Sequence, residues 1–203
     1  MSPLNTFCKR ALDFVVALFG LVLLSPVLLV IALVIRLSLG SPIFFQQVRP
    51  GYHSEPFTLV KFRTMTAGGS VVDQSTDALR LTRVGRLIRK FSLDEFPQLW
   101  NVLKGEMSLV GPRPLLMEYL AHYTAEQAKR HLMKPGITGL AQIKGRNEIT
   151  WEEKFLWDVW YVDHWSLWLD LRILVSTFEK IISGEGVSQQ GHATMEKFGA
   201  ERR

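Results

Sequence analysis

One long uncharged segment near the start of the chain constrains the fold most. From Phe14 to Ile35 no residue carries a charge, and this run approaches the roughly 20 residues that an α-helix needs to cross a hydrocarbon core. A cleaved signal peptide fits less well, because its apolar region usually has only ~7–15 residues and no small-x-small cleavage site follows here. The segment therefore predicts a membrane helix.

Ser25 and Pro26 stand at the middle of this run. Proline removes a backbone donor and clashes with the carbonyl four residues earlier, so we expect the helix to bend here. The serine hydroxyl can donate to a carbonyl left without its partner, which matters in lipid because no water is present. A bent segment can cross the bilayer, or it can turn back and leave both ends on one side.

Positive charge occurs on both sides of the apolar run. Lys9 and Arg10 precede it and Arg36 follows it, and more cations come later in the chain: Lys61, Arg63, Arg80, Arg83, Arg86, Arg89 and Lys90. The positive-inside rule therefore identifies no outer side. A re-entrant hairpin with a cytoplasmic body fits this symmetry, but proline kinks also occur in spanning helices, and these residues alone leave both topologies open.

The composition limits the class of protein and its partners. A chain of 203 residues has room for one ordinary domain, and 47% hydrophobic residues exclude a disordered chain. Lys and Arg number 24 against 19 Asp and Glu, a net charge of +5, which favours an anionic partner such as phosphate, lipid headgroup or nucleic acid. The single cysteine, Cys8, excludes an internal disulfide and a multi-cysteine metal site.

Short strands followed by helices are predicted after the apolar run. Ile43–Phe45 and Phe57–Phe62 favour β-structure and flank Arg49-Pro50-Gly51, which predicts a small hairpin. Ala67–Asp77 has the composition of a surface loop. Two capping-box patterns, Thr124 with Gln127 and Thr150 with Glu153, predict helices near residues 125–133 and 151–163. The predicted class is α-rich α+β.

Five of the six tryptophans fall between residues 151 and 168. Tryptophan is enriched where a protein surface meets lipid headgroups, although the same rings can fill the core of a small domain. The segment Ser166–Ile182 mixes apolar and charged residues, and it can form a helix that lies in the plane of the membrane interface.

Two adjacent carboxylates, Asp94 and Glu95, occur where a helix is expected to begin. Helix architecture alone can explain them, because Ser92 and Glu95 match a capping box and acids suit a first turn. Cations surround them, however: Arg86, Arg89 and Lys90 come before, and Gly111-Pro112-Arg113-Pro114 comes after. An arginine locked between prolines loses little entropy on binding and suits bidentate recognition of phosphate.

Two further clusters are candidates for a site. Lys61–Met65 carries Lys61 and Arg63 on one face of a predicted strand, as any solvated strand edge can. Pro135–Gln142, followed by Gly145-Arg146-Asn147, has glycines that permit close approach of a ligand or an irregular turn. The sequence has no Walker-type loop, no metal-binding histidine pair and no Ser-His-Asp signature. Carboxylates and cations remain, and they fit metal-assisted phosphoryl transfer.

Three segments together, Lys61–Met65, Ser92–Pro114 and Lys134–Asn147, resemble the bacterial sugar transferases, specifically the small monotopic phosphoglycosyl transferases. The resemblance covers nearly the whole chain, and its long central block is the most specific part. It implies a re-entrant membrane helix in residues 1–40, broken at Ser25-Pro26, and a phosphoglycosyl transferase domain in residues 41–203. That domain would have interfacial helices and lie on the cytoplasmic face of the bacterial inner membrane.

The resemblance also implies a two-step reaction. Asp94 would attack the β-phosphate of a UDP-sugar and release UMP, and polyprenyl (undecaprenyl) phosphate would then take the phosphosugar from the enzyme. Glu95 would aid the lipid-phosphate step or hold the metal, which is Mg²⁺ with Asp94 as a ligand. The residues expected to bind phosphate or other parts of the substrates are Lys61, Arg63, Arg89, Arg113, Thr138, Gln142 and Arg146. Membrane lipids and downstream glycosyltransferases are the other expected partners.

The sugar and the class of activity are the remaining questions. The tail Gly186–Phe198 looks like that of family members serving protein N-glycosylation, whose sugar is N,N′-diacetylbacillosamine, whereas other members use galactose, glucose or N-acetylated hexoses. A membrane-anchored basic module that binds anionic lipid or nucleic acid without catalysis is the competing class. A pure anion-binding face should avoid carboxylates, so the acids among these cations favour an enzyme without a nucleic-acid partner.

Overall fold

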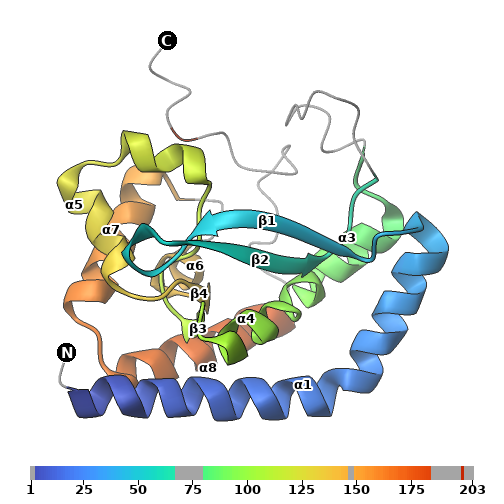
Figure 1. Ribbon diagram of the computed structural model, residues 1–203, viewed down its shortest axis with the longest axis horizontal. Coiled ribbons are helices and arrows are strands. Elements are labelled where there is room, and N and C mark those ends of the chain that lie inside the picture. Colours follow the sequence, from blue (N-terminus) through green and yellow to red (C-terminus); the bar gives the residue numbers. More distant parts are fainter. Residues whose placement is uncertain (1–2, 67–79, 146–148, 184–197, 199–203) are drawn as a thin grey trace.

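The computed structural model describes residues 3–66, 80–145, 149–183 and 198, and it is α-rich α+β as predicted. In chain order its helices and strands are α1 Pro3–Leu39, β1 Phe44–Pro50, β2 Pro56–Phe62, α3 Arg83–Lys90, α4 Gln98–Lys104, β3 Ser108–Val110, α5 Ala125–Ala128, β4 Gly136–Thr138, α6 Leu140–Lys144, α7 Trp151–Asp163 and α8 Leu167–Ser183 (Figure 1). Short 3₁₀ turns join them: η1 Tyr52–Ser54, η3 Leu93–Glu95, η4 Met117–His122 and η5 Lys129–Leu132. The predicted loop Ala67–Asp77 lies outside the described residues.

Helix α1 is long, apolar and bent. Figure 1 shows its first part running along the bottom of the molecule before it turns upward. Pro26 lies inside the helix, and its missing N–H leaves the carbonyl of Val22 without the usual helical donor. Ser25 Oγ donates a 2.8 Å hydrogen bond to this carbonyl. The expected compensation by the serine hydroxyl is therefore confirmed.

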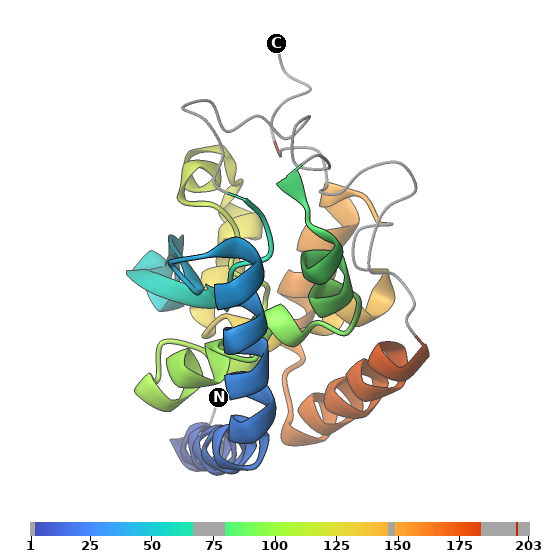
Figure 2. The ribbon, with the colours of Figure 1, turned by 90° about the vertical axis from the view of Figure 1, so that its right-hand side faces the viewer.

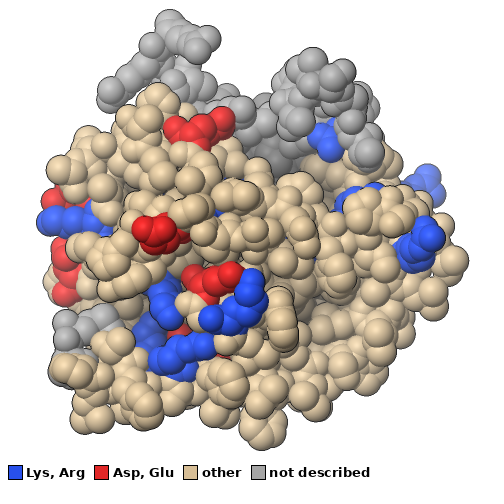
Figure 3. All heavy atoms as spheres, in the orientation of Figure 1, with Lys and Arg blue, Asp and Glu red and all other residues tan. Residues whose placement is uncertain are grey.

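The surface of α1 is that of a helix suited to lipid. Its length and composition are sufficient to cross a membrane, and many of its large apolar side chains are exposed, such as Phe19 at 70% and Leu23 at 78%. The part of the surface that α1 forms along the bottom of Figure 3 is largely free of charged side chains. An exposed apolar area of this kind marks an interaction surface, which suggests membrane association.

Charged side chains in the first turns of α1 form hydrogen bonds with other elements of the protein. The buried Lys9 donates hydrogen bonds to Asp170 in α8 at 2.6 Å and to the carbonyl of Val110 at 3.1 Å. Arg10 donates to the carbonyls of the last turn of α4, and Asp13 accepts a hydrogen bond from the backbone N–H of Leu109. Buried charged groups are retained when they are paired, as here.

The other end of α1 reaches the same body. Ile31 and Ile35 are buried with Phe62 of β2 and Ile88 of α3 in a small apolar cluster. Arg63, just after β2, donates hydrogen bonds to the carbonyls of Leu39, Gly40 and Ser41. Both ends of the bent helix therefore contact one folded body.

Two small sheets organise the centre of the molecule. β1 and β2 pair antiparallel from Phe44 opposite Phe62 to Pro50 opposite Pro56, which confirms the predicted hairpin. β3 and β4 pair in parallel, with Val110 opposite Thr138. The main core lies between these elements, α4, α7 and α8, and includes Val102, Met107 and Tyr161.

The two capping boxes confirm two predicted helix starts. In both, the threonine accepts from the third backbone N–H while the Gln or Glu side chain bonds back to the threonine N–H. The helix starting at Thr150 runs to Asp163 as expected. The one starting at Thr124 is shorter than expected, because α5 gives way to the 3₁₀ turn η5 at Lys129.

The tryptophans divide between the core and the surface. Trp157 and Trp165 pack against the main core, whereas Trp168 on α8 is 60% exposed. Leu171, Val175 and Phe178 are exposed on the same helix at helical spacing. Figures 1 and 2 place α8 and the first part of α1 at the same end of the molecule, so an apolar helix face lies beside the apolar surface of α1.

Candidate active site

An open groove of about 1360 Å³ contains the predicted site residues that the structure describes. Its walls include the hairpin, η3, the Pro-Arg-Pro segment, α6 and α7. The expected residues that line it are Lys61, Arg63, Arg89, Asp94, Glu95, Arg113, Thr138 and Gln142. Arg146 lies outside the described residues. Four separate sequence motifs therefore converge on one groove.

The Asp-Glu pair lies on η3, the turn between α3 and α4. Ser92 precedes it in the left-handed conformation with φ 53° and makes no side-chain cap. The capping box expected from Ser92 and Glu95 is therefore wrong. The carboxylate of Glu95 instead meets two cations from distant parts of the chain, so helix architecture does not explain this acid.

Glu95 is held by Lys61 and Arg113. Lys61 Nζ and Arg113 Nη2 each lie 2.7 Å from Oε1 of Glu95, whose side chain is 16% exposed. Burial by itself would raise the pKa of Glu95, but the charges of Arg113 and Lys61 and their hydrogen bonds hold it well below its usual range. Glu95 is therefore a fixed anion with little basicity.

Asp94 has a different environment from its neighbour. Burial raises its pKa and the charge of Glu95 raises it further, while Lys61, Arg89 and Arg113 oppose the rise. Within the described residues the Asp94 carboxylate has no hydrogen-bond partner, and it lines the groove. Two neighbouring carboxylates with opposite shifts are typical of a pair with different chemical roles. Asp94 is the more basic of the two and the one available to react.

Asp94 is the carboxylate at this site that a magnesium ion could bind. The described residues contain no group of three or more His, Cys, Asp or Glu side chains that could form a complete metal site. Mg²⁺ often uses only one or two carboxylates, together with waters and substrate phosphates. Asp94 is compatible with that donor set, whereas Glu95 already accepts from two cations.

The other predicted residues have partners that position them at the groove. Arg89 Nε donates to Thr64 Oγ1 at 2.9 Å. Arg63 donates to the backbone carbonyls at the end of α1 and just after it. Thr138 shares a 2.7 Å hydrogen bond with Thr177 of α8, and Gln142 Nε2 donates to the carbonyl of Ile137. Arg63 thus has a structural role in addition to lining the groove.

The glycines of the Pro135–Gln142 segment allow two backbones to meet. A Cβ atom on Gly136 would lie 2.1 Å from the backbone N of Gly111, and one on Gly139 would lie 2.2 Å from the Gly111 carbonyl oxygen. Gly136 N donates to Pro112 O, and Gly111 N donates to Thr138 O. Close packing of two chain segments therefore explains these glycines, and it sets the position of the segment that carries Arg113.

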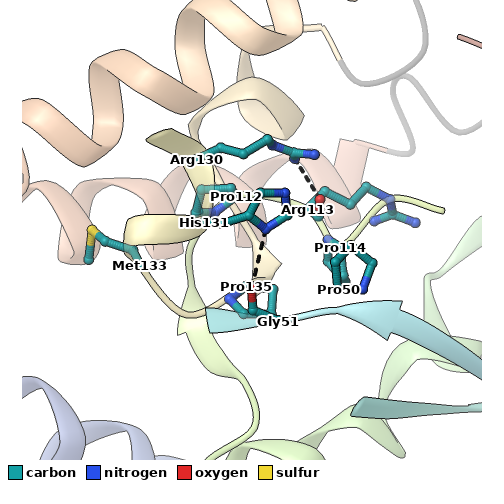
Figure 4. A pocket seen from close by; sticks show the side chains of 9 residues that line it. All are labelled: Pro50, Gly51, Pro112, Arg113, Pro114, Arg130, His131, Met133 and Pro135. Atoms are coloured by element: carbon teal, nitrogen blue, oxygen red, sulfur yellow. Dashed lines mark hydrogen bonds between the residues drawn. The ribbon is translucent and has the colours of Figure 1, made fainter. Parts of the chain in front are cut away.

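Behind Arg113, a buried ion pair supports the Pro-Arg-Pro segment. Arg130 donates to the Arg113 carbonyl at 2.7 Å and to Asp158 of α7 at 2.6 Å. Figure 4 shows Arg130, His131 and the prolines around a pocket of only about 10 Å³, room for about one water. Nδ1 of His131 donates to the Gly51 carbonyl beside it. This pocket supports the site but does not admit a substrate.

Sequence reasoning missed Arg130 and Asp158, as well as two cations at the groove, Arg49 and Lys154. Asp158 and Lys154 lie on a helix recognised only by its cap and its aromatic residues. Arg49 was expected in the turn Arg49-Pro50-Gly51 but lies in β1, which continues to Pro50. No motif marked these four residues as parts of a site, so only their positions in space connect them to it.

Several known proteins are similar to this chain in sequence. A family model described as "Bacterial sugar transferase" matches residues 4–184. An uncharacterized sugar transferase of Bacillus subtilis, EpsL, is 58% identical over 94% of this chain and 95% of its own length. A UDP-glucose:undecaprenyl-phosphate glucose-1-phosphate transferase of Caulobacter vibrioides is 41% identical over 86% of this chain and 70% of its own length.

Other relatives are longer than this chain. A transferase of the same name from Klebsiella pneumoniae is 40% identical, and a UDP-galactose-lipid carrier transferase of Erwinia amylovora is 39% identical. The chain spans 41% and 42% of their lengths, respectively.

Proposed function

Because this chain belongs to the bacterial sugar transferase family, we propose that it transfers a sugar phosphate from a UDP-sugar to polyprenyl phosphate, such as undecaprenyl phosphate, and releases UMP. The observation that carries the proposal is the pair Asp94 and Glu95, two adjacent carboxylates with opposite pKa shifts in a groove lined by cations. In a module that only binds anions, a carboxylate among the cations would repel the ligand, so the presence of Asp94 favours an enzyme.

In the proposed first step, an oxygen of Asp94 forms a bond to the β-phosphorus of the UDP-sugar. The bond from that phosphorus to the bridging oxygen breaks, and UMP leaves with the electron pair. An oxygen of polyprenyl phosphate then attacks the same phosphorus and frees Asp94. Dividing the transfer in this way allows a soluble and a lipid substrate to use one open site in turn.

The cations around the pair would stabilise charge on the phosphate. Lys61, Arg89 and Arg113 are the groups whose charges act on Asp94, and fixed positive charges are most effective where negative charge develops. Glu95 keeps Lys61 and Arg113 in position at 2.7 Å. Mg²⁺, with Asp94 as a ligand, would supply further charge neutralisation when it is bound.

The proposed topology is re-entrant, with the N-terminus and the catalytic body both on the cytoplasmic face of the inner membrane. Two contacts support it: Lys9 binds Asp170 near the start of α1, and Arg63 binds the carbonyls at its end. A helix that crossed about 30 Å of hydrocarbon could not place both ends on one body. The exposed apolar faces of α8 and α1 would then lie in the interface.

For the sugar, two lines of reasoning differ. The tail Gly186–Phe198 resembles that of members acting on UDP-N,N′-diacetylbacillosamine, but apart from Phe198 it lies outside the described residues. The names of two longer relatives specify glucose and galactose. We keep UDP-N,N′-diacetylbacillosamine as the donor to test first, on that tail alone, with UDP-glucose and UDP-galactose beside it.

The test measures UMP after mixing the purified protein with each UDP-sugar, Mg²⁺ and undecaprenyl phosphate. Without the lipid, the native enzyme should release at most one equivalent of UMP and gain the mass of one phosphosugar. Asp94→Asn should do neither, because an amide is a poor nucleophile. Glu95→Gln should be strongly impaired while still forming the covalent species. UMP release by Asp94→Asn at the native rate would exclude the nucleophile, and no release from any donor would overturn the function.

A further inference from the structure

One wall of the groove carries cations that the mechanism above does not use. Arg49 lies at the end of β1, and Lys154 lies in the first half of α7. Both line the same groove as Asp94 and Arg113. The rings of Tyr119 and Trp151 line this part as well, edge to face with centroids 5.6 Å apart.

Arg49 is a largely buried cation without an acidic partner in the described part of the chain. Its Nη2 donates to the amide oxygen of Gln47 at 2.6 Å, and its buried Nε has no partner there. Burial lowers the pKa of Arg49 to about 10, with Arg113 as the next largest cause. The attraction of Glu118 is a smaller influence than burial and the charge of Arg113. A guanidinium in this position lacks the anion that normally compensates a buried charge.

Lys154 has the same relationship to Arg113. Burial and the Arg113 charge lower the pKa of Lys154 to about 8. The carboxylate that opposes this shift belongs to Asp158, and Arg130 already binds it at 2.6 Å. The ammonium lies 4.9 Å from the centre of the Trp151 ring. The charge of Arg113 thus acts on both Arg49 and Lys154, and the three cations line one groove, where they would attract an anionic ligand.

We propose that Arg49 and Lys154 form, beside Arg113, a second phosphate subsite, which holds the phosphate that stays with the nucleotide: the α-phosphate of the UDP-sugar and then of the UMP product. This inference rests on the proposed function. Arg113 Nη2 contacts Glu95, and the charge of Arg113 acts on both Arg49 and Lys154. All three cations and Asp94 line one groove, and the two phosphates of a diphosphate are adjacent, so a diphosphate that reacts at Asp94 would place its other phosphate in the same groove.

The position of the subsite favours the nucleotide over the lipid phosphate. α1 packs against α4 and β3, whereas β1, the strand that carries Arg49, packs against η4. A lipid phosphate would approach from the surface that α1 forms.

The experiment compares UMP with uridine as ligands of the full-length protein, by equilibrium binding without turnover. These ligands differ only in the phosphate, so the ratio of their affinities reports the subsite. In the native protein UMP should bind more tightly than uridine. Arg49→Gln and Lys154→Gln should each weaken UMP binding by roughly tenfold, the value of one charge-assisted hydrogen bond, and leave uridine unchanged. Lys129→Gln, which removes a surface charge, should match the native protein.

A half-reaction assay separates the alternatives. If the two variants bind UMP as the native protein does but need more undecaprenyl phosphate to discharge the covalent intermediate, the subsite belongs to the lipid and the nucleotide assignment is wrong. If native protein releases UMP from a UDP-sugar while both variants keep native UMP affinity and kinetics, the subsite does not exist and the proposed function stands. Should Arg49→Gln fold poorly by circular dichroism, Lys154→Gln and Arg49→Lys decide, and Arg49→Lys should retain most of the UMP preference.

Discussion

Lys9 Nζ lies 2.6 Å from a carboxylate oxygen of Asp170, and both side chains are almost completely buried. The pair joins the beginning of α1 to α8 across 161 positions of the chain. Tyr161 and Trp165 donate to the same carboxylate at 2.6 and 3.1 Å. Helices α1 and α8 are thus joined by a buried charge pair.

Lys9→Met should strongly destabilise the protein. It leaves the Asp170 charge buried without its cation, a loss that typically costs ~3–5 kcal/mol. Chemical unfolding in detergent would measure the change, and Lys129→Met, which breaks the exposed pair with Glu126, should cost less than about 1 kcal/mol. Adding Asp170→Asn to Lys9→Met should recover part of the loss. Equal effects of the two lysine variants would show that the buried pair does not hold α1.

Replacing Ser25 and Pro26 together by alanine should favour a straight helix that crosses the membrane. The change removes a proline penalty of roughly 3 kcal/mol from the helix interior. A single cysteine placed near Ser2, with Cys8 replaced, would report the side of the N-terminus to a membrane-impermeant thiol reagent. The native segment should remain protected in intact cells, and the double variant should be at least partly labelled. Labelling of the native segment from outside would rule out the re-entrant topology.

Arg113→Gln and Lys61→Met should each move the acidic limb of the pH–rate profile to higher pH. Both cations hold the pKa of Glu95 below its usual range, so removing either one raises that pKa, and the anion is lost at a higher pH as acid is added. The profile of kcat/KM for UMP release would show the shift, with Lys129→Gln as the charge-matched control. An unmoved limb in both variants would mean that the charge of Glu95 does not govern the rate.

His131 should make the fold sensitive to mild acid. Burial, followed by the charge of Arg130, lowers its pKa from 6.5 to about 4, so between these values the unfolded chain binds a proton that the folded chain does not. Stability therefore falls as the pH drops through this range, on the order of 2 kcal/mol once solvent screening is allowed for. His131→Asn keeps a donor for the Gly51 carbonyl but does not titrate. Its unfolding free energy should change less between pH 7 and 4.5, and an identical slope in the two proteins would contradict this assignment.

Local features of this protein were readable from the sequence. The cap residues Thr124 and Thr150, the hairpin at Pro50-Gly51 and the bond from Ser25 to the carbonyl freed by Pro26 each depend on atoms within a few residues. Their partners are close in the chain whatever the rest of the fold does, so a pattern of residue types was sufficient to predict them.

Contacts between distant segments were decided by the tertiary structure. The capping box expected at Ser92 failed because Lys61 and Arg113, 34 and 18 positions from Glu95, are better partners for a carboxylate than a backbone N–H. Arg49 was expected only in a turn and Lys154 only in a helix, and both line one groove with Arg113 only in the folded protein. The sequence by itself determined that α1 is apolar and bends. Only the packing of Lys9 on Asp170 and of Arg63 on the end of α1 decided that both ends meet one body, because burial and ion pairing depend on which surfaces the whole chain brings together.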